Sequence, residues 1–173
     1  LAGRIGGTIV VALPGVAASD FGVSGNFEVV LNNTTAPISE QFELNGETLT
    51  LEVPAGPFLR VVGTDVQLRL FGQRLSGNFG FEQASIPCTP TPTCTPAKVV
   101  RIAASNVTLA LGDGTTDYIR LTNGEAFLIV LPAITGPTPK TGGVVGRISG
   151  SIDFNLPVPM IGSGKNPYQF ISV

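Results

Sequence analysis

The sequence predicts an all-β fold: a many-stranded antiparallel sandwich, a barrel-like sheet or an elongated stacked sheet, with short turns and no substantial helix. Three observations lead to this fold class. Apolar and polar residues alternate with a period of two along most of the chain, as in strands that turn one face toward a core. Turn-forming residues interrupt these runs about every eight to twelve residues. A hydrophobic content of 43% indicates a folded chain, and the 22 Gly and 14 Pro residues indicate that frequent turns divide it into short elements.

The first half of the chain is predicted to form strands that each end at turn formers. Pro14-Gly15, Asn32-Asn33, Asn45-Gly46 and the segment 54–57 all favour turns through their backbone preferences. The alternating runs between them are Ile5 to Leu13, Phe21 to Leu31, a run ending at Leu44, Leu49 to Val53, Val66 to Leu70 and Leu75 to Phe81.

The second half continues the pattern after residue 98. Asp113-Gly114 between two alternating runs is a strong hairpin signal, and Asn123-Gly124 predicts another turn. The runs are Val107 to Leu111, Tyr118 to Leu121, Phe127 to Leu131, Ile148 to Leu156 and Tyr168 to Val173. About a dozen strands are expected in all.

A short phrase occurs four times in the chain. It consists of a large apolar residue, Ser or Gly, an invariable Gly, a small or polar residue and a further apolar residue. The copies are 5–9, 23–27, 75–79 and 148–152. The shared glycine falls on the apolar face in every copy, where a missing side chain leaves room for a bulge, a bend or a facing aromatic ring.

The two ends of the chain share a longer similarity. Gly3-Arg4-Ile5 recurs as Gly146-Arg147-Ile148, and Leu13-Pro14 recurs as Leu156-Pro157, at a constant distance of 143 residues. This spacing predicts one long unit at 1–145, and the start of a second unit or exchanged terminal strands at 146–173. Because the chain begins at Leu1 rather than Met, we expect a processed product or a piece of a longer protein.

Several segments together resemble units that are tandemly repeated in very large secreted bacterial proteins. These are SGNFEVVLNNTT from Ser24, LTLEVPAGPFLRVVGTDVQL from Leu49, LSGNFGFEQ from Leu75, VVRIAASNVTLALGDGTTDYIRLTNGEAFL from Val99 and GRISGSIDFNLP from Gly146. The resemblance implies a secreted protein of the cell surface or extracellular matrix with a building role. The segment 86–97, rich in Cys, Thr and Pro, departs from the pattern and is interpreted as an insertion.

We therefore expect a structural, self-associating repeat or filament subunit, joined head to tail by strand pairing or complementation. The partner would be the protein itself, as a homopolymer or as tandem copies. The candidate self-association residues are Ile5, Ile9, Val11, Ile148, Ile152 and Phe154. The alternative is a β-sandwich binding or adhesion module that recognises surface glycans or another cell surface, although Trp is absent and only two Tyr residues are present.

The composition argues against an enzyme and predicts no cofactor. The chain contains no His, the commonest general base, so Ser24, Ser76 and Ser149 lack the usual activating partner. Glu43, Glu47 and Glu52 are better explained as solvent-facing strand positions than as paired catalytic carboxylates. A formal net charge of −2 does not favour nucleic acid as a partner, and no apolar run approaches the length of a membrane span.

Local motifs give a few further candidate sites. Cys88 and Cys94 are predicted to form a disulfide, since cysteines this close usually pair in an exported protein and no His is present to complete a metal site. Asp113 and Asp117 could supply oxygen ligands to Ca²⁺, but two acids are too few and the hairpin turn explains Asp113. Possible glycosylation acceptors in Asn-x-Thr sequons are Asn32, Asn33 and Asn106.

Overall fold

The computed structural model describes residues 1–18, 20–86, 97–133 and 141–156. Within these ranges all regular structure is β, in nine strands, which confirms the predicted class. The strands are β1 (Ala2–Val11), β2 (Phe21–Asn32), β3 (Ile38–Leu44), β4 (Glu47–Val53), β5 (Phe58–Leu70), β6 (Gln73–Ile86), β7 (Ala97–Gly112), β8 (Asp117–Leu131) and β9 (Gly143–Phe154).

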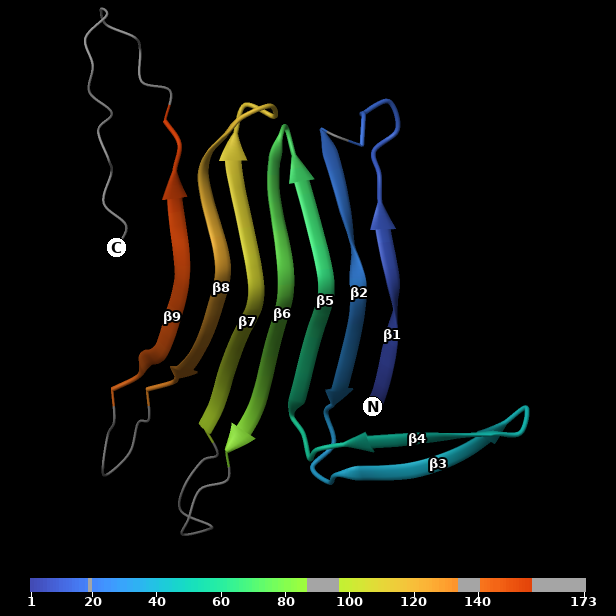
Figure 1. Ribbon diagram of the computed structural model, residues 1–173. Helices are drawn as coiled ribbons and strands as arrows, with labels where there is room; N and C mark the ends of the chain where they lie inside the picture. Colours follow the sequence, from blue (N-terminus) through green and yellow to red (C-terminus); the bar gives the residue numbers. More distant parts are fainter. Residues whose placement is uncertain (19, 87–96, 134–140, 157–173) are drawn as a thin grey trace, which may run out of the picture.

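Seven strands form one antiparallel sheet in the order β1-β2-β5-β6-β7-β8-β9. The sheet is a meander into which one hairpin, β3-β4, is inserted between β2 and β5. The hairpin runs across the end of the sheet and past β1, roughly at right angles to the other strands (Figure 1). The large sheet is open: β1 and β9 are its two edges, and it does not close into a barrel.

The strand register sorts the side chains of this sheet onto two chemically different faces. Residues directly opposite each other in paired strands share a face. One row across the sheet consists of Ile5, Val29, Val61, Phe81, Ile102, Leu128 and Gly146. The neighbouring row, on the other face, consists of Arg4, Val30, Arg60, Glu82, Arg101, Ile129 and Val145. We call the face of Val61 the apolar face and that of Arg60 the polar face.

A line of β-bulges crosses the middle of the sheet and explains the repeated phrase. The register shifts at Gly63/Val66, Ala104/Val107 and Thr122/Glu125. Asp65, Asn106 and Asn123 have positive φ at these points, near 52°, 54° and 52°. The phrase places a glycine of the neighbouring strand against each bulge, since a Cβ on Gly77 would lie 3.1 Å from Cα of Val107.

Two details of β8 differ from the sequence prediction. Asn123-Gly124 does not end a strand but forms the bulge inside β8, so the two runs predicted on either side of it are one strand. The extra residue also reverses the alternation beyond it. Ala126, Leu128 and Val130 therefore lie on the apolar face, whereas the prediction had Phe127, Ile129 and Leu131 as the apolar set. Tyr168 to Val173 lies outside the described residues.

The buried core of the described part is small and lies where the hairpin joins the sheet. Val30, Val53 and Phe58 form it, with Ile38, Leu51 and Ala84 packed against them. Asn32, only 1% exposed, joins the hairpin to the sheet: its Nδ2 donates to the carbonyl oxygens of Ala36 (2.9 Å) and Pro54 (2.8 Å). Its Oδ1 accepts from the backbone N–H of Thr34 at 2.8 Å. Every one of these polar groups is thereby satisfied without water.

Gly77 and Gly7 occupy the same position of the repeated motif. We expect their substitution by alanine to change the free energy of unfolding in opposite directions. Gly77 has φ +152°, and a Cβ there would meet Val107, so Gly77→Ala should lower the free energy of unfolding by about 1–3 kcal/mol. Gly7 has open space around it, and Gly7→Ala should raise that energy by about 0.4–1 kcal/mol through the unfolded chain. Urea unfolding of the monomer measures both. Equal effects of the two substitutions would contradict the bulge explanation.

Candidate functional site

The six residues predicted for self-association lie on the two edge strands. Each is at least 40% exposed, from Val11 at 40% to Ile148 at 73%. Ile5, Ile9 and Val11 belong to β1, and Ile148, Ile152 and Phe154 belong to β9. The two groups therefore stand at opposite ends of the sheet, so one molecule does not bring them together. They could meet only between units.

β1 and β9 are equivalent strands with opposite edges open. Six antiparallel pairings separate them, so both run in the same direction (Figure 1). Ile5 and its counterpart Ile148 also lie on the same face, because their rows across the sheet both belong to the apolar face. β2 lies on one side of β1, whereas β8 lies on the other side of β9. The open edge of β9 therefore corresponds to the edge by which β1 pairs with β2.

The glycines of these two strands have different surroundings. In β9, a Cβ on Gly146 would overlap the carbonyl oxygen of Phe127, and one on Gly150 would lie 2.8 Å from Cδ1 of Leu121. Their counterparts Gly3 and Gly7 in β1 have no atom within 4 Å of that position. β1 thus has the two glycines that β9 uses to approach β8, but at its open edge no strand of the described part lies beside them.

The apolar face is a second exposed surface. Phe81 and Ile102 are opposite each other near its centre and are 36% and 37% exposed. The hairpin core contains Val30, a polar-face residue, so the β3-β4 arm does not cover the apolar face. No other described segment forms a second layer over it. Sequence reasoning expected a second layer from the alternation and so missed this exposure.

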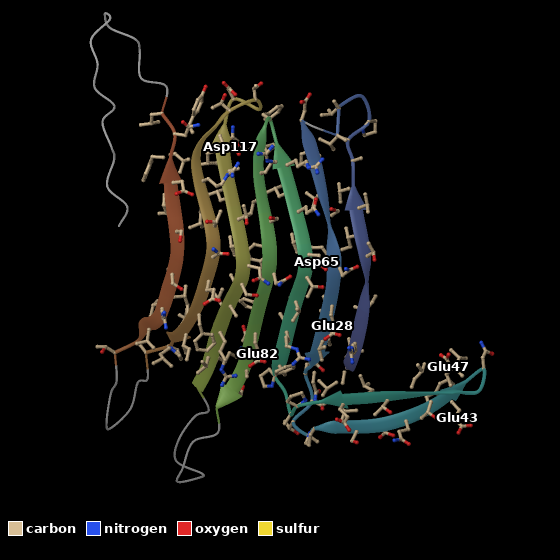
Figure 2. All side chains as sticks on the ribbon, viewed as in Figure 1. Glu28, Glu43, Glu47, Asp65, Glu82 and Asp117 are labelled. Atoms are coloured by element: carbon tan, nitrogen blue, oxygen red, sulfur yellow. The ribbon has the colours of Figure 1, made fainter. Side chains whose placement is uncertain are left out.

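The polar face carries cross-strand ion pairs. Glu28 of β2 contacts Arg4 of β1 and lies 3.6 Å from Arg60 of β5. Glu82 of β6 pairs with Arg101 of β7. Figure 2 labels both glutamates on their strands. Such partly exposed pairs add little stability each, and they keep this face compatible with water.

A second ion-pair group lies near the end of the sheet. Asp117 of β8 accepts hydrogen bonds from Arg74 at 2.9 Å and from Arg120 at 2.6 Å. The hydrogen bond from Arg120, aided by the positive charges of both arginines, lowers the pKa of Asp117. The carboxylate is therefore held by two cations, which does not favour a role as a Ca²⁺ ligand.

Asp113 has a turn-closing role. Its Oδ1 accepts from the backbone N–H groups of Thr115 (2.8 Å) and Thr116 (2.7 Å), and Tyr118 donates its hydroxyl to Oδ2 at 2.5 Å. The bond from Tyr118, followed by the two backbone bonds, lowers the pKa of Asp113 to about 2. This confirms the predicted hairpin between β7 and β8. Among the described residues, no group of three His, Cys, Asp or Glu side chains is close enough to hold a metal ion.

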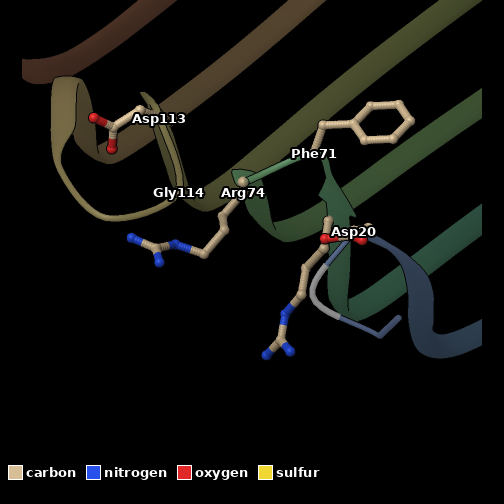
Figure 3. A pocket seen from close by; sticks show the side chains of 7 residues that line it. Asp20, Phe71, Arg74, Asp113 and Gly114 are labelled. Carbon is tan, nitrogen blue, oxygen red and sulfur yellow. The ribbon is translucent and has the colours of Figure 1, made fainter. Parts of the chain in front are cut away.

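The turns at this end of the sheet surround an open hollow of about 690 Å³ (Figure 3). Phe71, in the turn between β5 and β6, has φ +46° and is 74% exposed beside the hollow. The sequence predicted a break between the runs that end at Leu70 and begin at Leu75, without naming its turn residues. The hollow is lined by Asp20, Arg69, Phe71, Gly72, Arg74, Asp113 and Gly114. Two acids and two arginines give it no net charge, and Arg74 and Asp113 already have partners.

The remaining sequence-predicted residues are dispersed. Cys88 and Cys94 lie outside the described residues. Asn32 is buried with its amide nitrogen donating two hydrogen bonds, a geometry that does not favour a glycan acceptor, and its glycosylation stays a prediction. Asn33 and Asn106 are exposed, and their glycosylation stays a prediction. Glu43, Glu47 and Glu52 are exposed on the hairpin, as expected. Within the described ranges, no helix is long and apolar enough to span a membrane.

Comparison of the chain with protein-family models, with curated proteins and with solved structures found no match. The resemblance to tandem units of large secreted proteins therefore stays a prediction. The fold, the two open edges and the apolar face are the features on which a function can be based.

We expect the β7-β8 turn to depend on the ionisation of Asp113. Its pKa is lower in the folded chain, so its contribution to stability is present above about pH 4 and is lost as the pH falls toward 2. Tyr118→Phe removes the largest cause and should raise the pKa of Asp113 toward its ordinary value. Carboxyl ¹³C NMR titration measures this. The Asp117 signal is the internal control, because Arg74 and Arg120 hold that group; equal shifts at both aspartates would contradict the assignment.

Proposed function

We propose that this chain is a structural β protein that associates with further copies of itself, head to tail, through its edge strands. One observation carries the proposal: β9 repeats β1 in sequence, direction and face, while the two strands leave opposite edges open. A strand of this type can pair with a β8 strand on one side and a β2 strand on the other. It is therefore a natural junction between two sheets.

The junction would form in one of two ways. Where units follow each other in a single chain, β9 of one unit is also the first strand of the next. Where units are separate chains, one of the two equivalent strands is displaced and the other takes its slot, which is strand exchange. In both cases the sheet continues without a change of direction, and unpaired edge amides and carbonyls obtain partners.

The glycines of β1 support the docking of a β8 strand from another unit. Gly3 and Gly7 would take the places that Gly146 and Gly150 take against Phe127 and Leu121. A residue with a side chain at either position would keep such a strand away. The open edge of β1 therefore carries glycine at both positions where its counterpart β9 needs glycine to approach β8.

The register fixes how successive units would be placed. In the row that contains Ile5, β9 contributes Gly146, whose counterpart in the sequence repeat is Gly3. In the row that contains Val11, β9 contributes Ile152, whose counterpart is Ile9. Both comparisons give a displacement of two residues, about 7 Å along the strands per unit. A displacement that does not return to its start builds an open, growing assembly.

The extracellular location in this proposal comes from the resemblance to tandem units of secreted proteins, which also implies a matrix or cell-surface setting. The alternative, a module that binds carbohydrate or another cell surface, stays a prediction. Edge pairing has the more specific support, because two glycines, the direction and the face of β1 and β9 all agree.

The test is the double variant Gly3→Val and Gly7→Val. Both positions are open in the monomer, so the fold should persist by circular dichroism, while assembly should be lost in sedimentation velocity and electron microscopy at concentrations where the wild type assembles. Val10→Ile adds bulk to the same strand on the polar face and should leave assembly intact. A wild-type protein that stays monomeric at high concentration would contradict the proposal, as would growth of the folded double variant into assemblies larger than a dimer.

A further inference from the structure

The apolar face is large, and its one charged residue in the described part, Lys98, lies at its margin. Strands lie about 4.8 Å apart and each residue adds about 3.3 Å, so seven strands with about ten paired residues each present roughly 900–1,000 Å². A standard stable interface buries about 800 Å² per partner. The central rows on either side of the bulges carry no charged residue: Val29, Val61, Phe81, Ile102 and Leu128 on one side, and Val23, Leu68, Leu75, Leu109 and Leu121 on the other.

Within the described residues, charge separates the two faces completely over these rows. The five ion pairs join arginines to Glu28, Glu82 and Asp117, and all belong to the polar face. A partner for the apolar face must therefore be a flat, uncharged surface of similar size. Edge-to-edge growth does not supply one, because it extends the sheet within its own plane.

The aromatic residues on this face are placed as an interface centre would require. β6 is the middle strand of the seven, with three strands on each side. It contributes Phe79 and Phe81 to the apolar face. Large aromatic side chains near the geometric centre commonly dominate the energy of a protein interface.

We infer that the apolar face packs against the same face of a second copy of this chain, forming a two-layer β-sandwich. A two-fold axis that places β6 on β6 gives every strand a facing partner, and the central rows of the two faces meet without burying a charge. Sheets in such a sandwich lie about 10 Å apart, with their strands within about 30°. The occupant is a second copy because the same face has the required size and, in its central rows, the required lack of charge.

A lipid surface is the competing occupant. Interfacial lipid binding uses basic residues around an apolar patch, together with Trp and Tyr. The chain has no Trp, two Tyr residues and a net charge of −2, and the arginines of the ion pairs lie on the opposite face. These features favour protein over lipid.

The experiment compares Phe81→Glu with Phe127→Glu in the full chain. Both phenylalanines are exposed, at 36% and 49%, but Phe81 lies on the apolar face and Phe127 on the polar face. At concentrations below those at which edge-to-edge assembly begins, sedimentation equilibrium should show a dimer for the wild type and for Phe127→Glu. Phe81→Glu should raise the dimer dissociation constant at least about 100-fold, as expected for a central aromatic contact.

Two further measurements keep the inference testable if Phe81→Glu fails to fold. Binding of the dye ANS to the wild type should fall as concentration rises and the face becomes covered. The Gly3→Val and Gly7→Val double variant should still form the face-to-face dimer, which separates this inference from edge pairing. A wild type whose ANS binding per chain is constant with concentration would overturn the inference. So would a folded Phe81→Glu variant with wild-type dimerisation, or cosedimentation of the wild type with neutral phosphatidylcholine vesicles in place of dimer formation.

Discussion

The absence of a second layer over the apolar face, in the described part of the chain, is the constraint on which the rest of the structure depends. Alternating strands normally obtain their stability by burying one face against another element. Here most apolar residues of the large sheet are partly exposed. Of the buried side chains in the described part, Val30, Asn32, Val53 and Phe58 lie around the hairpin base, whereas Val99 and Ala110 belong to β7. Backbone pairing and side-by-side contact along the strands hold the sheet, while much of its apolar surface stays exposed in the described part.

The bulge line gives this sheet its defined register. Because strand side chains alternate, a slip by one residue would move every apolar group to the polar face. Glycines opposite the bulges of β5, β7 and β8 fit only one alignment, since other positions would place a side chain against the extra residue. The same motif glycine recurs in β9, opposite the β8 bulge, and in β1, which faces no bulge in the described part.

The sequence predicted the all-β class, most of the strands and several turns correctly because period-two alternation and turn chemistry are local properties. Asn45-Gly46 and Asp113-Gly114 do form hairpin turns. Asn123-Gly124 was misread because the positive φ that suits a turn also suits a bulge, and only the neighbouring strands decide between them. Strand order, the burial of Asn32 and the uncovered face depend on contacts between distant residues. Local sequence patterns do not predict such contacts. The identity of β1 and β9 as equivalent positions was foreseeable from the 143-residue spacing, but their complementary edges were not.

The β3-β4 arm has a consequence for any assembly built through the edge strands. Phe42, Leu44 and Leu49 are 66%, 51% and 49% exposed on it, and the arm leaves the sheet beside β1 (Figure 1). If β9 of one unit serves as β1 of the next, each unit adds six strands to the sheet. The arms would then recur about every 29 Å across the strands. An extended sheet would thus carry regularly spaced hairpins with exposed apolar side chains along one margin. Hairpins of neighbouring sheets could then pack against each other and join the sheets into a layer.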